Sequence, residues 1–367
     1  MKKILVTDYL QRHSQIIIKS LEKNYKVYSF TKTKLEAKFF NVEFLKTKPN
    51  ETNINILISI MKDNGIETIV PISIKDYNFF SIHKNKIESS GIQILISSYE
   101  IWSMLNDKNK TMNFATKIGV PIPKTIYLSK NKFIDEINSN LLYKIVIKSV
   151  NEGGARFVRY ATNDSEAKNI IVEFEKQKKD IFSKGIIAQE YIEGQSCAYF
   201  CISKNGEIIS EFGHIREREN PPTGGVSTSC KSFYHEKLFK YGKKIVMNSK
   251  YTGVCMVEFK YVKDRDEFYL IEVNPKFWGS ILLPIVSGID FPNIYMKVIN
   301  NENVIKKSFK NKKIQYFLSD LSRSIRFKRD FDKFFQDFFD RNITKDIYYM
   351  GVFRYIKYNI GKKIYAK

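Results

Sequence analysis

Two strand-like runs joined by four polar residues constrain the fold of this chain more than any other feature. The runs are TGVCMVEFKYV at 252–262 and EFYLIEVNPKF at 267–277, and both are rich in β-branched and aromatic residues. A short polar joint between two such runs is typical of a β-hairpin. A hairpin centred on Arg265 places Glu258 directly opposite Glu272.

Asn274 lies two residues beyond Glu272, so the hairpin brings a carboxamide to the same face as both carboxylates. Opposed residues in a hairpin have Cβ atoms roughly 4.5–5.5 Å apart, where like charges repel each other. Oxygen ligands of this kind suit Mg²⁺, or Mn²⁺ in its place. Glu258, Glu272 and Asn274 therefore predict a metal site. The alternative is a solvated acidic face, which apolar neighbours such as Met256 and Phe259 disfavour.

Length and composition set the broad class of the protein. The 367 residues predict two or three domains, and a hydrophobic content of 43% is enough for packed cores. No apolar stretch approaches the ~20 residues of a membrane helix, and Asp8 and Arg12 interrupt the N-terminus where a secretory segment would need apolar residues. We expect a cytoplasmic protein. The four cysteines form no CxxC pair, so neither a zinc site nor structural disulfides are expected.

The N-terminal third alternates between strand and helix patterns. Strands are expected at 2–8, 25–30 and 67–73, with helices at 14–23 and 53–62. Such alternation predicts a parallel α/β unit. No GxGxxG motif follows the first strand, so a dinucleotide-binding fingerprint is absent.

The remaining pattern predicts a mixed α/β arrangement with four regions. Helices are expected at 109–118, 164–179 and 234–250, strands at 143–149, 157–162, 186–192, 197–202 and 207–212, and a flexible loop at 219–229. We place the regions at 1–105, 106–190, 191–300 and 301–367.

Several strand ends carry side chains that could bind a nucleotide. Lys148 ends an apolar strand before a turn that contains Glu152, Gly153 and Gly154, whose backbone N–H groups could cover phosphates. Residues 189–192 lie at the end of another strand, where backbone N–H and C=O groups could bind the edge of an adenine ring.

Arg216 and Arg218 alternate along a strand, so both are expected to face one pocket and grip carboxylate or phosphate. The alternative for this pair is a surface ion pair with Glu217 or Glu219. The loop that follows has the composition of a lid.

The net charge of +22 implies attraction to polyanions, and residues 301–367 hold 17 of the Lys and Arg residues against 7 acidic ones. Phenylalanines at helical spacing between 327 and 339 predict one amphipathic helix. This helix either packs on the main body or contacts an anionic membrane surface. A nucleic-acid binder is a weaker hypothesis, because no nucleic-acid module is recognisable.

Taken in order, these segments resemble the ATP-grasp superfamily, and are most similar to carbamoyl-phosphate-synthase-like carboxylate–amine ligases often associated with surface-polysaccharide pathways. The resemblance covers roughly residues 1–300. The motifs that carry it are Asp107-Lys108 before VPIPKT, VIKS with EGGAR, QEYIEG, REREN with PPTGGVST, and VEF with IEVNPKFWGS. It implies an ATP-grasp fold of α/β and α+β type, with an N-terminal parallel α/β (pre-ATP-grasp) domain and a helical C-terminal tail.

The resemblance also implies roles for matched positions. The residues expected to bind ATP are Lys108, Lys148, Glu152, Gly153, Gly154, Gln189, Glu190, Tyr191 and Ile192. The metal ligands would be Glu258, Glu272 and Asn274, and the groups near the reacting phosphate would be Lys148, Arg216 and Lys276. Lys276 stands where the family usually has arginine. Ser196 replaces a ribose-binding glutamate and Phe157 a glycine, which puts ribose contacts and the mobility of the phosphate loop in doubt.

The implied reaction is ADP-forming ligation. A substrate carboxylate attacks the γ-phosphate of ATP, and an amine then displaces phosphate from the acyl phosphate to give an amide. The alternative is a protein that binds Mg-ATP without ligating. The partners would be a small-molecule carboxylate and an amine, with no nucleic acid. Neither substrate nor the oligomeric state follows from the sequence.

Overall fold

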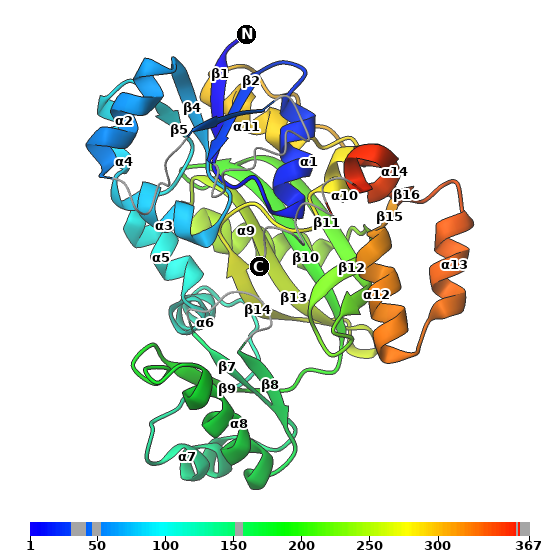
Figure 1. The fold of residues 1–367 in the computed structure, drawn as a ribbon. Helices are drawn as coiled ribbons and strands as arrows, with labels where there is room; N and C mark the ends of the chain where they lie inside the picture. The colour runs from blue at the N-terminus through cyan, green and yellow to red at the C-terminus, as the bar shows by residue number, and fades with distance from the viewer. Residues whose placement is uncertain (31–41, 46–52, 151–156, 357–358, 360–367) are drawn as a thin grey trace.

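The computed structural model describes residues 1–30, 42–45, 53–150, 157–356 and 359. In this part of the chain, sheets of five, four and seven strands follow one another along the sequence. Figure 1 shows the N-terminal sheet and the largest sheet packed together, with the four-stranded sheet standing apart on the far side of α6. The four region boundaries predicted above remain predictions.

The N-terminal sheet is wholly parallel, in the order β3-β2-β1-β4-β5. Its strands are β1 (Lys3–Val6), β2 (Lys26–Phe30), β3 (Val42–Leu45), β4 (Ile66–Val70) and β5 (Gln93–Ile94). Its helices are α1 (Arg12–Leu21), α2 (Ile54–Asp63), α3 (Ile74–Ile82) and α4 (Lys84–Ser89). The predicted parallel α/β unit is therefore confirmed, although the short strands β3 and β5 were missed.

Two helices lead from this sheet to the four-stranded sheet, which has the order β6-β9-β7-β8. They are α5 (Tyr99–Asn106) and α6 (Lys108–Lys117). The sheet and its helices comprise β6 (Thr125–Tyr127), α7 (Phe133–Asn140), β7 (Ile145–Ser149), β8 (Val158–Ala161), α8 (Asp164–Gln177) and β9 (Ile186–Glu190). Every pairing in this sheet is antiparallel.

The largest sheet has the order β14-β13-β10-β11-β12-β15-β16. Its strands are β10 (Gln195–Lys204), β11 (Glu207–Asn220), β12 (Val226–Ser232), β13 (Gly253–Val262), β14 (Glu267–Asn274), β15 (Lys313–Gln315) and β16 (Thr344–Lys345). A 3-10 turn, η2 (Lys263–Arg265), joins β13 to β14. The expected flexible loop at 219–229 is only partly present, because its second half forms β12.

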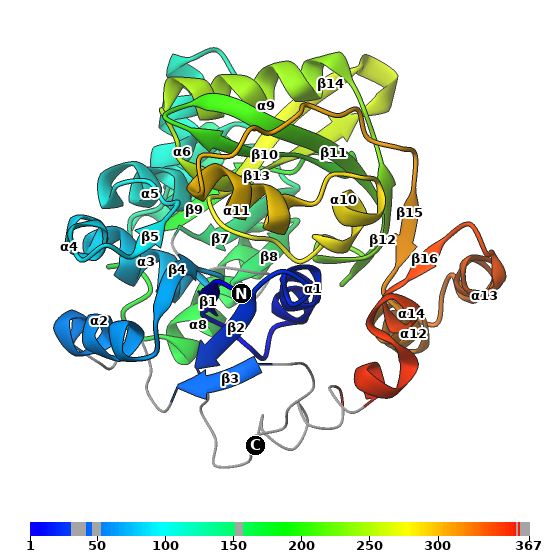
Figure 2. The ribbon, with the colours of Figure 1, turned by 90° about the horizontal axis from the view of Figure 1, so that it is seen from above.

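Helices cover both faces of this sheet, because its strands alternate buried side chains between two cores. Cys197, Tyr199 and Cys201 pack in the core that includes α9 (Glu236–Asn248), whereas Phe200 and Ile202 pack in the core shared with the N-terminal sheet. The helices on this second side are α10 (Leu282–Val286) and α11 (Phe291–Ile299). Figure 2 shows α9 on one side of the sheet and α10 and α11 on the other.

The C-terminal segment contains α12 (Phe317–Phe327), α13 (Phe331–Phe339) and α14 (Asp346–Met350). The amphipathic helix predicted here is confirmed as α13 for all of its phenylalanines except Phe327, which ends α12 because Lys328 and Asp330 adopt the left-handed conformation and separate the two helices. In both views α12 lies beside β12 and α13 lies at the periphery. β15 and β16 extend the largest sheet, so this segment adds strands as well as helices.

Candidate active site

The hairpin β13–β14 brings the two predicted carboxylates together. Glu258 pairs directly with Glu272 across the antiparallel ladder, as predicted. The register shifts by one residue between Glu258 and Phe259. Near the tip Val262 pairs with Glu267, one residue out of the register of a hairpin centred on Arg265, and the bulge restores the expected pairing at Glu258.

Asn274 joins the two carboxylates. Its Nδ2 donates to Glu258 Oε1 at 3.1 Å and to Glu272 Oε1 at 2.8 Å. The three side chains therefore lie on one face of the hairpin, as the alternation of side chains along β14 predicts. A rotation of the Asn274 amide by half a turn would present its oxygen to the same point.

Two cations, from β11 and α6, pair with the carboxylates of this acidic face. Arg216 on β11 donates through Nη2 to Glu258 Oε2, and Lys108 at the start of α6 places Nζ 3.6 Å from Glu272 Oε2. Arg216 also donates through Nη1 to the carbonyl of Gly225 at 2.9 Å. Two of the residues predicted to face phosphate thus lie against the predicted metal ligands.

The two glutamates differ in their electrostatic surroundings. Burial raises the pKa of Glu258 to about 7, although Arg216 opposes the shift. Burial would raise the pKa of Glu272 too, but Lys108, the Asn274 amide and Lys148 lower it to about 2. Glu272 is therefore ionised at neutral pH, whereas Glu258 is protonated in part.

Lys148 reaches this site from the four-stranded sheet. Its Nζ donates to Gln189 Oε1 at 2.8 Å and to the carbonyl of Ile271 on β14 at 3.4 Å. Burial and repulsion by Lys108 lower the pKa of Lys148 to about 8. Lys148 and Gln189 are diagonal neighbours on the paired strands β7 and β9, which explains why two sequence-predicted residues meet.

Strand β9 ends where the adenine contacts were predicted. Glu190 is the last residue of β9, and its side chain is exposed and accepts from the backbone N–H of Lys124 at 3.3 Å. Tyr191 follows, with Lys144 Nζ 3.7 Å from its ring centroid. Ile192 is 7% exposed. These residues line the junction between the small sheet and the largest sheet, and their contact with adenine remains a prediction.

Lys276 follows the hairpin directly. Its Nζ donates to the carbonyl of Phe277 at 3.3 Å, and burial lowers its pKa while Glu272 and Glu258 raise it. Glu152, Gly153 and Gly154, expected to cover the phosphates, lie outside the described residues.

Arg218 does not share the pocket of Arg216. It pairs instead with Asp320 and Asp337 of the C-terminal segment. The β11–β12 ladder shifts register on both sides of Arg218, so the regular alternation assumed for this strand does not hold. The predicted common pocket for the two arginines is therefore wrong.

Sequence reasoning missed two residues beside the site. Thr125 Oγ1 accepts from Gln189 Nε2 at 2.7 Å, and the hydroxyl of Tyr160 on β8 donates to the carbonyl of Thr223 in the β11–β12 turn. Both contacts join residues more than sixty positions apart. No local pattern could have revealed them.

The donor set fits a magnesium ion that is shared with phosphate oxygens. Among the described residues, no group of three or more His, Cys, Asp or Glu side chains is placed to hold a metal. Mg²⁺ keeps several waters and is usually bound through one or two carboxylates together with substrate phosphates. Glu258, Glu272 and the carboxamide of Asn274 match that description, and they do not match a cage made by the protein alone.

Comparisons with known proteins agree with this geometry. Residues 105–280 match the family model described as an ATP-grasp domain. The chain is 24% identical over 264 residues to a urea amidolyase of Lachancea kluyveri, covering 67% of this chain and 14% of that protein. It is 22% identical over 265 residues to a carbamoyl-phosphate synthase of Methanobrevibacter smithii, covering 65% and 69%.

A solved structure extends the likeness to most of the fold. It is the biotin carboxylase domain of the Hydrogenobacter thermophilus 2-oxoglutarate carboxylase, in complex with MgADP, ADP and bicarbonate. The TM-score is 0.66 at 17% identity, covering 82% of this chain and 70% of that one. This confirms the expected ATP-grasp fold. The chain spans only 14% of the urea amidolyase, so the activity of that whole protein cannot be transferred to this chain.

Proposed function

We propose, on the premise that residues 105–280 form an ATP-grasp domain, that this chain is an ATP- and Mg²⁺-dependent ligase. It activates a carboxylate as an acyl phosphate and joins it to an amine, with release of ADP. The observation that carries the proposal is the convergence of Glu258, Glu272 and Asn274 on one face, paired with cations from β11 and α6.

Glu258, Glu272 and Asn274 would hold the metal. The amide nitrogen of Asn274 faces both carboxylates, so its oxygen would serve as a ligand with the side-chain amide rotated by half a turn. Mg²⁺ at this position would offset negative charge on the β- and γ-phosphates.

Lys148 of the four-stranded sheet and Lys108 of α6 would bind the nucleotide phosphates. Lys148 and Lys108 already lie next to the carboxylate site, so a triphosphate bound there would receive both ammonium groups. Gln189 orients Lys148 through a hydrogen bond. The strand end at Glu190 to Ile192 would then accommodate adenine, with Glu190 available for the exocyclic amine.

Chemistry would proceed by in-line attack of the substrate carboxylate on the γ-phosphate. Arg216 and Lys276 would stabilise the charge on the transferred group, which is the main demand of phosphoryl transfer. The amine then attacks the acyl carbon, and phosphate leaves with the electron pair of the carbon–oxygen bond. The β11–β12 turn, whose Thr223 carbonyl accepts from the Tyr160 hydroxyl of β8, would keep water from the acyl phosphate.

An assay of ADP release tests the proposal. Amino acids and amino sugars are offered as amines with a panel of small carboxylates, in the presence of Mg²⁺ or Mn²⁺. Glu272→Ala should abolish turnover, whereas Glu267→Ala, at the far end of the same strand, should not. Undiminished turnover of Glu272→Ala refutes the metal site.

Tight Mg-ATP binding with no phosphoryl transfer to any acid supports the non-ligating alternative instead. A role in surface-polysaccharide synthesis would be supported if amino sugars were the preferred amines.

We also propose that the C-terminal segment contacts an anionic membrane surface from the cytoplasmic side. Phe331, Phe335 and Phe339 follow one another at every fourth position of α13 and are 39%, 48% and 73% exposed. The side chains of Lys333 and Arg329 beside them are 68% and 58% exposed. An outward aromatic stripe flanked by cations is typical of helices that lie on anionic lipid.

Among the described residues, no helix is long and apolar enough to cross a bilayer, so any such contact would be peripheral. Co-sedimentation with vesicles that contain phosphatidylserine tests it, with neutral vesicles as the comparison. Replacing Phe335 and Phe339 by serine should reduce binding to anionic vesicles. Equal partitioning of the variant and the wild-type protein would end this proposal.

A further inference from the structure

We infer that helices α12 and α13 form part of the catalytic unit, in which they hold strand β11 so that Arg216 points at the carboxylate site. The inference rests on the proposed ligase function for its kinetic consequence. It concerns a segment outside residues 105–280, where the family match ends. The residues that carry it are positioning residues, since they act through Arg216.

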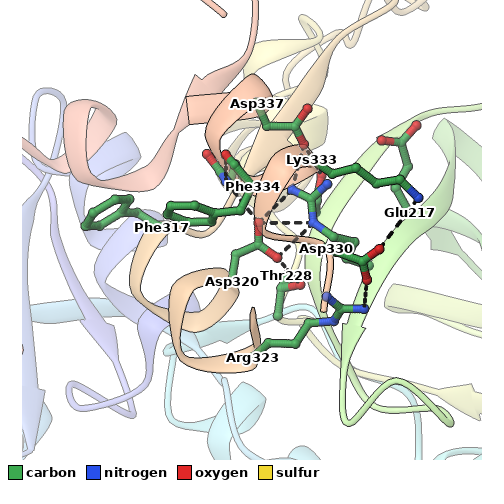
Figure 3. A network of polar contacts seen from close by, with 12 residues as sticks. Glu217, Thr228, Phe317, Asp320, Arg323, Asp330, Lys333, Phe334 and Asp337 are labelled. Atoms are coloured by element: carbon green, nitrogen blue, oxygen red, sulfur yellow. Dashed lines mark hydrogen bonds and ion pairs between the residues drawn. The ribbon is translucent and has the colours of Figure 1, made fainter. Parts of the chain in front are cut away.

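A buried ion cluster joins β11 to both helices. Arg218 donates through Nη2 to Asp320 of α12 and to Asp337 of α13, at 2.6 Å in each case. The side chain of Arg218 is 4% exposed, and that of Asp320 is fully buried. Thr228 and Gln315 donate to Asp320 at 2.8 and 2.9 Å, so strands β12 and β15 join the same cluster. Figure 3 shows Asp320 turned toward Thr228 in this network.

Ion pairs continue from the buried groups Arg218, Asp320 and Asp337 to the partly exposed Lys313 and Glu217 and the exposed Lys231. Lys313 on β15 pairs with Asp337 at 2.8 Å and also with Glu217 on β11. Glu217 pairs in turn with Lys231 on β12 at 2.9 Å. With Arg218 and Asp320, the cluster holds three cations and three carboxylates. A buried charge is tolerated when it is paired in this way, and removal of one partner leaves the others uncompensated.

A second contact connects α12 to the turn that adjoins Arg216. Arg323 of α12 donates through Nε to the backbone carbonyl of Glu219 at 2.8 Å, and its Nη2 donates to Asp330 at 2.8 Å (Figure 3). The Glu219 side chain accepts from the N–H of Gly225 at 2.9 Å, and the carbonyl of Gly225 receives Nη1 of Arg216. The chain of contacts thus runs from α12 through the β11–β12 turn to Arg216.

The backbone pairing of β11 with β12 does not by itself fix the direction of Arg216. The register between β11 and β12 is irregular between Arg216 and Arg218 and again between Arg218 and Glu219. A bulged segment bends and leaves residues unpaired, so its direction depends on other contacts. On the β10 side, Gln195 Nε2 donates to the carbonyl of Arg216 at 2.8 Å. Beyond Arg216, the side chains of Glu217 and Arg218 pair with the C-terminal segment.

Asp337→Asn tests the inference, with Glu22→Gln as the matched control. Asp337→Asn removes one carboxylate from the cluster at β11, whereas Glu22→Gln breaks the ion pair between Arg354 and Glu22, which ties the same C-terminal segment to α1 at 3.1 Å. Hydrogen exchange of the full-length protein should quicken at residues 219–225 in Asp337→Asn and remain as in the wild type in Glu22→Gln. The kcat should fall about tenfold in Asp337→Asn, with the KM for ATP changed by less than about twofold, because misdirection of a catalytic side chain acts on the transition state.

Two results would overturn the inference. One is unchanged exchange at 219–225 in Asp337→Asn, and the other is a loss of kcat that Glu22→Gln shares. If Asp337→Asn does not fold, Lys313→Gln takes its place, because it loosens Asp337 while Arg218 keeps both carboxylates; it is expected to give a smaller change in the same direction. If the wild-type protein releases no ADP with any acid, the ligase proposal fails by itself. The exchange comparison then still decides whether α12 and α13 hold β11.

Discussion

Magnesium binding should weaken as the pH falls below 7, because Glu258 must lose a proton before it can become a ligand. Burial raises its pKa to about 7, against the opposing effect of Arg216. A carboxyl with that pKa is about nine-tenths ionised at pH 8 and about one-tenth ionised at pH 6. Affinity for Mg²⁺ should therefore fall about tenfold between these values, or ~1.4 kcal/mol. Glu272, with a pKa of about 2, does not titrate in this range.

Calorimetric titration of Mg²⁺ into the ADP-saturated protein at pH 6, 7 and 8 measures this dependence. The nucleotide phosphates titrate in the same range, so Glu258→Gln is the matched control, since it keeps the nucleotide and loses the carboxyl. The wild-type affinity should change about tenfold more across the range than that of the variant. Parallel pH dependences in the two proteins would refute the reasoning, because Glu258 would then be ionised throughout.

Three further outcomes are expected. Lys148→Met should weaken ATP binding by about tenfold or more in equilibrium dialysis at pH 7, and wild-type affinity alone should decline above pH 8, where Lys148 loses its proton. Asn274→Asp should lower Tm without metal and enlarge the rise in Tm that Mg²⁺ produces, since a third carboxylate repels the other two until a cation arrives. Gly242→Ala would place a methyl carbon 2.3 Å from the ring of Tyr199 and should lower the free energy of unfolding by about 1–3 kcal/mol in urea titrations, whereas Gly279→Ala, with no atom nearer than 3.8 Å, should not.

The juxtaposition of Glu258, Glu272 and Asn274 could be predicted because it depends on local features. Side-chain alternation along β13 and β14 and a short joint determine which residues face each other. The bulge after Glu258 was invisible in the sequence, but it corrects the one-residue difference in register near the tip, so Glu258 still pairs with Glu272. The parallel N-terminal sheet was predictable for a similar reason, since its strands and helices alternate in short segments.

Contacts between distant segments could not be predicted. Arg218 looked like a partner of Arg216 because regular alternation places both on one face. Its carboxylate partners come from α12 and α13, about a hundred residues later in the chain. The break between these helices depends on left-handed conformations at Lys328 and Asp330. Glycine usually marks such positions in a sequence, and neither residue is glycine. Asp330 instead accepts from Arg323, a side-chain contact that stabilises the turn.

The carboxylate site lies against two cations that could also pair with nucleotide phosphates. Lys108 and Arg216 neutralise Glu272 and Glu258, and Asn274 donates to both. A magnesium ion at the carboxylates would take over this neutralisation and release the two cations toward the phosphates that arrive with it. The cations would exchange partners and remain paired, which limits the cost of burying the carboxylates in either state. We therefore expect metal and nucleotide to bind together, because either one alone would leave an uncompensated charge beside the carboxylates.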